Sequence, residues 1–302
     1  MRIMAGFRIG FSCRQETPIL LALRTHPSRR HDLLSEERLV FDPDLPSHDY
    51  LDNFGNLCTR FVAPAGDILI HTEFLVRDSG QADPVVPSAP QHYVEDLPDD
   101  VLVYLLGSRY VDTDHLGDIA GALFTDVAPG WPRVQAICDF VHNHITFNYA
   151  AADHRRTAYG GYGDRTGVCR DFAHLAIALC RCMNIPARYC TGYLGDIGVP
   201  RDPAPMDFCA WFEAFLGGRW YAFDARHNRP RIGRILVATG RDATDVALST
   251  SFGAAKLTTF DVLTEEIADP PAPVTTSDSR VPRRRRPIPP RRLATAARAA
   301  PR

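Results

Sequence analysis

The sequence predicts an α+β fold. Its first 85 residues consist of short β-rich runs separated by Pro, Gly, Asn and Asp. Two later segments, 132–143 and 169–183, carry apolar residues at helical spacing, and 207–224 has the pattern of a hairpin around a Gly-Gly pair. Strands first, followed by helices with a hairpin, favour a sheet domain followed by a mixed domain.

The N-terminal residues 1–85 predict a β-sandwich-like accessory domain. The runs ILLALRTH, ERLVFDP, CTRFVAP and DILIHTEFLVRD have the length and composition of strands. No grouping of an acid, a base and a nucleophile stands out among them. Residues 86–130 should then supply a linker and helices, because four prolines fall within 83–100 and helical patterns follow at 99–106 and 115–124.

The clearest helix spans 132–143. Pro132 suits its first turn, and apolar residues repeat at i, i+3, i+4 and i+7. His142 and His144 close it while facing different ways, which favours a structural role for both. The glycine-rich segment 157–168 predicts a loop, and it lacks the Gly-Lys-Ser/Thr ending of a phosphate-binding loop.

Cys169 begins the next predicted helix, 169–183, and a strand at 187–194 should follow. A cysteine in the first turn has its thiol beside unpaired backbone N–H groups and the positive end of the helix dipole. Both stabilise the thiolate, which is the nucleophilic form. Cys180 and Cys182 lie two to three turns further on and lack this position. Cys169 is therefore the predicted reactive cysteine.

A hairpin is predicted over 207–224, with 217–218 as its two turn residues. Opposing residue numbers then sum to 435, so that Cys209 would face Arg226. Alternation of side chains also puts Asp224 on the face of Cys209, as its diagonal neighbour. A bulge at the turn would change this pairing.

The segments GVCRDFAHLAIALCRCMNIPAR and DFCAWFEAFLGGRWYAFD resemble the transglutaminase-like superfamily, whose core is shared with papain-type cysteine proteases. The likeness runs from about 131 to 260 and includes RIGR and GRDATDVAL. The β-rich first third is similar to the N-terminal domain of bacterial members. The resemblance implies a papain-like core over 131–262, with the cysteine-bearing helix packed on an antiparallel sheet. It implies a Cys-His-Asp triad. Neither a cofactor nor a metal is expected.

Carried over by position, the resemblance makes Cys169 the nucleophile and Asp224 the residue that orients the base. The base belongs at position 209, where the family has His-Ala-Trp and this chain has Cys209. A thiol has no second nitrogen, so it cannot bridge the other two residues as histidine does. His227 is the candidate substitute if the strand breaks before it. His174 is excluded, because it lies about 140° around the helix from Cys169.

Three functions remain open. The favoured one is a thiol enzyme that acts on carboxamide or peptide bonds as an amidase, protease or acyltransferase. A catalytically lapsed member that binds or scaffolds is the second, and a redox or metal site at Cys169 and Cys209, with Asp224 and His227, is the third. The expected substrate is a protein, a peptide or an amide-containing small molecule.

The composition excludes a membrane-spanning helix: 45% of residues are apolar, 23% are charged, and no run approaches about 20 apolar residues. Arginines interrupt the first apolar residues, so a signal peptide is not expected and the cytoplasm is the predicted location. There the eight cysteines would stay reduced. Cys180, Cys182 and Cys190 lack a second pair at zinc-finger spacing and should pack in the core.

Residues 263–302 are expected to form a disordered tail rich in arginine and proline. Nine arginines against one aspartate give 271–302 a net charge of about +8, although the whole chain carries −2. Such a composition buries too little apolar surface to offset the entropy of ordering. A solvated extension is favoured, and weak binding to nucleic acid or another anionic surface is the alternative.

Overall fold

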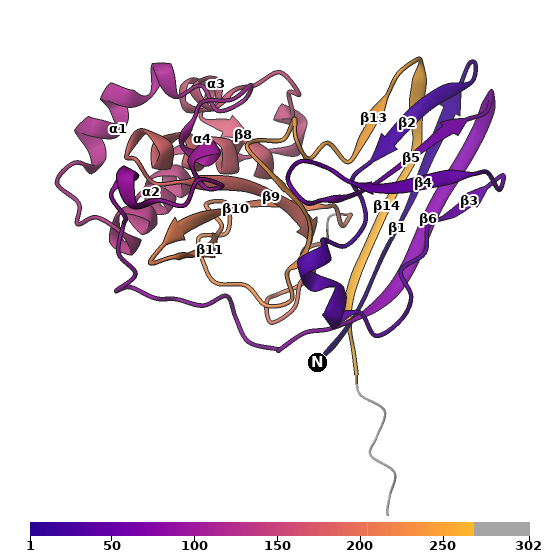
Figure 1. Ribbon diagram of the computed structural model, residues 1–302, viewed down its shortest axis with the longest axis horizontal. Helices are drawn as coiled ribbons and strands as arrows, with labels where there is room; N and C mark the ends of the chain where they lie inside the picture. The colour runs from indigo at the N-terminus through magenta and orange to yellow at the C-terminus, as the bar shows by residue number, and fades with distance from the viewer. Residues whose placement is uncertain (204, 269–302) are drawn as a thin grey trace, which may run out of the picture. The chain divides into compact units, whose positions relative to one another are not determined.

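Eight strands form two four-stranded sheets in the computed structural model, which describes residues 1–203 and 205–268 (Figure 1). One sheet has the order β14-β1-β6-β3 and the other β13-β2-β5-β4, with all pairs antiparallel. Their bounds are β1 Arg2–Cys13, β2 Thr17–Leu21, β3 Val40–Asp42, β4 Ser47–Leu51, β5 Leu57–Ala63, β6 Gly66–Arg77, β13 Ser249–Ser251 and β14 Ala255–Ile267. Alternate residues of β6 are buried, as a one-sided strand requires. The predicted β-sandwich-like fold is confirmed, but it extends beyond the predicted bounds 1–85, because β13 and β14 also belong to its sheets.

The end of the described chain completes this sandwich. β14 pairs with β1 along its whole length, from Arg2 opposite Ile267 to Cys13 opposite Ala255. The boundaries expected at residues 262 and 263 therefore fall inside β14, and 263–267 are strand rather than tail. The expected basic tail from 269 onward lies outside the described residues. β14 was not predicted, because it has a single buried residue and no strict alternation.

The remaining elements form the mixed part of the fold. The helices are α1 Gly117–Phe124, α2 Trp131–His144, α3 Ala158–Asp164 and α4 Cys169–Cys182. The strands are β7 Thr146–Phe147, β8 Thr166–Gly167, β9 Ala187–Tyr193, β10 Cys209–Leu216, β11 Arg219–Phe223 and β12 Ile235–Gly240. Short 3₁₀ helices are η1 Pro27–Asp32, η2 Val94–Asp96, η3 Leu102–Leu105, η4 Thr113–His115 and η5 Tyr149–Ala151. The helix predicted at 99–106 is thus only the single turn η3.

Helix α4 packs on the antiparallel sheet β11-β10-β9-β12, as the resemblance implies (Figure 1). Its residues from Asp171 to Arg181 are all buried, and Asn184 ends it in the left-handed conformation, at φ 58°. No helix among the described residues has the length and apolarity needed to cross a bilayer.

The glycine-rich segment 157–168, predicted to be a loop, contains α3. The Thr157 side chain accepts a hydrogen bond from the Gly160 amide (3.2 Å), which caps the start of the helix. Arg165 ends it in the left-handed conformation at φ 55°. A cap at one end and a left-handed residue at the other, with packing on α4, outweigh the low helix propensity of glycine.

The hairpin β10–β11 has the predicted turn. Gly217 and Gly218 have φ of 56° and 82°, and the pairs from Leu216–Arg219 to Phe212–Phe223 all sum to 435. The register is confirmed over these residues. β11 nevertheless ends at Phe223, so the pair expected between Cys209 and Arg226 does not form.

Candidate functional site

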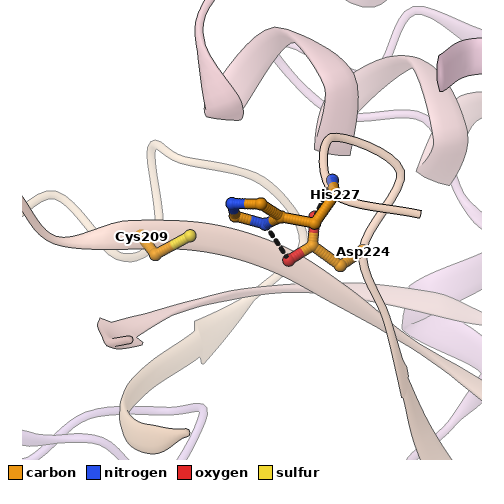
Figure 2. Close-up of side chains that lie close together, drawn as sticks. All are labelled: Cys209, Asp224 and His227. Carbon is orange, nitrogen blue, oxygen red and sulfur yellow. Dashed lines mark hydrogen bonds and ion pairs between the residues drawn. The ribbon is translucent and has the colours of Figure 1, made fainter. Parts of the chain in front are cut away.

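A tight turn after β11 carries the imidazole of the site. Asp224 Oδ1 accepts a hydrogen bond from the His227 backbone N–H (3.0 Å), and the Asp224 carbonyl accepts one from Asn228 N–H (2.7 Å). This local capture of N–H groups by an aspartate ends the strand ladder. The turn also brings the His227 ring back onto the same carboxylate: Nδ1–H donates to Asp224 Oδ2 at 2.8 Å (Figure 2).

The Asp224 carboxylate is buried and fully paired. Arg234 Nη2 donates to the same Oδ2 at 3.0 Å, and Arg234 Nε donates to Asp83 Oδ2 at 2.8 Å. Burial raises the pKa of Asp224, but the Arg234 charge and the two hydrogen bonds from His227 outweigh it and hold this pKa well below its usual range. Asp224 is therefore a stable anion that can fix the orientation of an imidazole.

Helix α2 holds the turn from behind. His142 Nδ1–H donates to the Arg226 carbonyl at 2.9 Å. Asn228 is held between Gln135, which donates to it (3.0 Å), and Asp139, which accepts from it (2.8 Å). The structural role predicted for His142 is thus confirmed. It fixes the backbone that carries the candidate base.

Cys209 is the first residue of β10 and is buried, with 7% of its surface exposed. One ligand-type atom from each of Cys209, Asp224 and His227 lies within 4.8 Å of the other two. In Figure 2 the imidazole lies between the Asp224 carboxylate and the Cys209 thiol. Burial, followed by the charges of Asp224 and Cys169, raises the pKa of the Cys209 thiol well above its usual range.

Cys169 opens α4 as predicted and is half-buried. Burial raises the pKa of its thiol, although a hydrogen bond from the Ala210 amide and the charge of Arg226 act in the opposite direction. The expectation that the helix start would make this thiol acidic is therefore wrong in direction, because the loss of hydration outweighs those favourable contacts. A base is needed to ionise it.

Two cavities are lined by residues of this site. Cys169 lines one of about 490 Å³, whereas Cys209 and His227 line another of about 430 Å³. Asp207 and Phe208 belong to the walls of both. Each thiol thus opens onto its own cavity, and the imidazole belongs to the cavity of Cys209.

The other candidate residues have structural surroundings. His174 is fully buried, accepts a hydrogen bond from the Ala243 amide (3.2 Å) and stacks on Tyr110. Burial lowers its pKa to about 3, which agrees with its exclusion as a base. His144 contacts the Tyr162 carbonyl, and all eight cysteines are free thiols.

Arg234 and Asp83 are the site residues that the sequence analysis missed. Asp83 begins the proline-rich segment 83–100, 151 residues before Arg234, and no local pattern joins the two. Arg234 is the last residue of the motif RIGR, which carried part of the resemblance. A buried arginine is almost always paired with an acidic residue, but the motif does not identify which acidic residue that is.

Comparisons with known proteins identify the family. The family model of the transglutaminase-like superfamily core matches residues 120–225. The crystal structure of a "putative cysteine protease" from Cytophaga hutchinsonii is 30% identical, covers 89% of this chain and 92% of its own, and has a TM-score of 0.75.

Two further matches are partial or distant. ML0607 of Mycobacterium leprae is 38% identical over 104 residues, which are 33% of this chain and 37% of that protein, so the match spans little more than a third of this curated relative. The periplasmic domain of TgpA from Pseudomonas aeruginosa is 13% identical, with 74% and 88% coverage and a TM-score of 0.37, too low to support any inference. The family model and the likeness over nearly the whole Cytophaga protein agree on one family of thiol enzymes, and this chain belongs to the transglutaminase-like superfamily.

Proposed function

We propose that this protein is a thiol enzyme that cleaves or transfers acyl groups at carboxamide or peptide bonds, with Cys169 as the nucleophile. His227, oriented by Asp224, takes the role of the histidine that the family has at position 209. The observation that carries the proposal is the 2.8 Å hydrogen bond from His227 Nδ1 to Asp224. It supplies an imidazole–carboxylate pair although Cys209 occupies the usual position.

The reaction runs through a thioester. The Cys169 sulfur attacks the carbonyl carbon while its proton passes to His227 Nε2, and the Cys169 backbone N–H helps to hold the developing oxyanion. The C–N bond then breaks, and the imidazolium returns the proton to the leaving amine or ammonia. Water gives a carboxylic acid, or a second amine gives a new amide. Asp224 stays ionised throughout and stabilises the imidazolium.

A protein or peptide, or an amide-containing small molecule, is the proposed substrate. The cavity of about 490 Å³ at Cys169 has room for one side chain or a small ligand, and its walls carry Arg170, Tyr189 and Thr191. These supply both apolar surface and hydrogen-bonding groups. The eight free thiols support a reducing compartment, and we therefore propose the cytoplasm as the location.

The lapsed-enzyme alternative is supported by the partial burial of Cys169, which raises the pKa of its thiol. A thiol that stays protonated and has no base would make the chain a binding protein. The two functions differ in whether Cys169 turns over an acyl group.

Hydrolysis of p-nitrophenyl acetate, followed together with mass mapping of the acylated residue, tests the proposal. We expect turnover by the wild type, an acetyl group on Cys169, and loss of turnover on the order of 10²-fold or more in Cys169→Ala. Cys180→Ala, in the core of the same helix, is the matched control and should keep the wild-type rate. Full turnover by a folded Cys169→Ala protein, or none by the wild type, would contradict the proposal.

A further inference from the structure

The imidazole of His227 lies close to the thiol of Cys209, on the other side from Asp224 (Figure 2). His227 Nδ1 is taken up by Asp224, so Nε2 is the nitrogen that can exchange a proton. Cys209 completes the group whose atoms lie within 4.8 Å of one another, and Cys169 is not a member of that group among the described residues (Figure 2). A thiol, an imidazole and a carboxylate thus stand in the order that nucleophilic catalysis by cysteine requires.

A metal ion fits this group poorly. Asp224 Oδ2 already accepts hydrogen bonds from His227 and from Arg234, and Oδ1 accepts one from the His227 amide. A cation would have to displace these donors from the carboxylate. It would also lie near the positive charge of Arg234, which is buried and fixed by Asp83. The occupied carboxylate and the charge of Arg234 therefore disfavour a cation at this group.

The same positive charges act on the Cys209 sulfur. Arg234 and Arg226 both stabilise its thiolate, but burial and the nearby acids outweigh them, and the pKa stays raised. Hence Cys209 holds little thiolate by itself at neutral pH. Its reactivity must depend on proton transfer to His227, and this dependence makes the role testable.

Reagents have a route to this thiol. Cys209 and His227 line the cavity of about 430 Å³, together with Tyr149, Met206 and Arg231. Cys169 opens onto the other cavity. The two thiols therefore line different cavities.

We infer that Cys209 is a second nucleophile of this protein, activated by His227 and Asp224, which accepts acyl groups from the 430 Å³ cavity. The inference rests on the acid–base role of His227 in the proposed function. In the step, the Cys209 proton moves to His227 Nε2 as the S–C bond forms at an ester or amide carbonyl. The C–O or C–N bond then breaks, and the imidazolium protonates the leaving group. The product is a thioester on Cys209.

Cys190 provides an internal control. It lies on β9 in the same apolar cluster as Cys209 and is fully buried, but it does not belong to the imidazole group. Modification of Cys190 in the native protein would report general opening of the fold. His227→Asn is the matched variant, because its amide can still donate to Asp224 but cannot serve as a base.

The experiment treats the native full chain with p-nitrophenyl acetate and, separately, iodoacetamide at pH 7, and maps every modified cysteine by mass spectrometry over time. We expect modification of Cys209 with Cys190 unmodified, and a rate at Cys209 reduced on the order of 10²-fold in His227→Asn. Circular dichroism and unfolding in urea check that the variant is folded.

Two results would overturn the inference: Cys209 that reacts only in denaturant, as Cys190 should, or Cys209 that reacts equally fast in a folded His227→Asn protein. The same data test the proposed function independently of this inference. Loss of turnover in Cys169→Ala with Cys209 unmodified supports the proposed function alone. Modification of Cys209 that depends on His227, with Cys169 unmodified, supports the second nucleophile alone.

Discussion

His227 is bound to Asp224 twice, by its backbone N–H at 3.0 Å and by its ring Nδ1 at 2.8 Å. The residues are three apart, so both bonds form within a single turn. The orientation of this imidazole therefore does not depend on the register of the sheet, as that of a histidine on β10 would. The site can therefore contain a histidine base even though Cys209 occupies the position on β10 where the family has its histidine.

Replacing the imidazole should remove the chemistry and keep the fold. His227→Asn retains a donor for Asp224 but has no nitrogen that can accept a proton. We expect kcat/KM for thiol-dependent ester hydrolysis to fall by about 10²–10⁴-fold. His48→Asn, an exposed change on β4, should keep the wild-type value, and equal activity in the two variants would rule out His227 as the base.

The Asp224–Arg234 pair should be visible in the dependence of stability on pH. The pKa of Asp224 is depressed in the folded protein, so its contribution is complete above its unfolded pKa of about 3.9 and is lost as the pH falls below it. Asp224→Asn leaves a buried guanidinium without this counter-charge, which costs about 3–5 kcal/mol at pH 7.

Urea unfolding of the wild type and of Asp224→Asn between pH 7 and pH 2 measures that contribution. The difference in unfolding free energy between the two proteins should stay constant down to about pH 4 and shrink below it. Because other acids titrate in both proteins, only this difference is informative. A difference that is unchanged at pH 2 would mean that Asp224 is not the group responsible.

Gly192 should tolerate no side chain. It lies opposite Cys209 on β9, and a Cβ there would sit 2.1 Å from the Ile235 carbonyl oxygen and 3.0 Å from the Trp211 ring. We expect Gly192→Ala to destabilise the protein by about 1–3 kcal/mol in urea unfolding. Gly117→Ala, at the start of α1 with open space around its Cβ, should cost nothing, and similar losses in both would refute this steric cause.

Cys209→His should restore the family's usual base. The new imidazole would begin β10 beside Asp224, with the 430 Å³ cavity to accommodate its larger volume. We expect amidase or acyltransferase activity to appear or to rise. Cys209→Asn is the control, because it adds a polar group without a base. If Cys209→His changes nothing while the fold stays intact, the assignment of the triad positions is wrong.

The sequence anticipated those parts of the site that depend on local patterns. Cys169 begins a helix with a regular apolar face, and the Gly-Gly pair gives the hairpin register. The end of β11 could not be predicted, because the strand is stopped by a hydrogen bond that the Asp224 side chain accepts from the His227 amide, not by a change in hydrophobic periodicity. If β11 had continued, the alternation of side chains would have put His227 on the face opposite Cys209. The strand ends at Phe223, so His227 can reach Asp224.

Long-range pairing set the second limit. The Arg234–Asp83 ion pair joins the proline-rich segment 83–100 to the motif RIGR. No sequence pattern at either residue identifies the other as its partner. The acidity of Cys169 was also misjudged from position alone. A helix start favours the thiolate, but whether burial outweighs it depends on how the rest of the chain covers the sulfur.

The pairing of β14 with β1 has a consequence for synthesis on the ribosome. β1 is synthesised long before β14, so its neighbour on one side is available only when residues 255–267 have left the exit tunnel. Until then β1 has an unpaired edge that is exposed to solvent or to chaperones. The segment that carries Cys169 and His227 is synthesised before β14. We therefore expect this segment to begin folding before β14 can pair with β1.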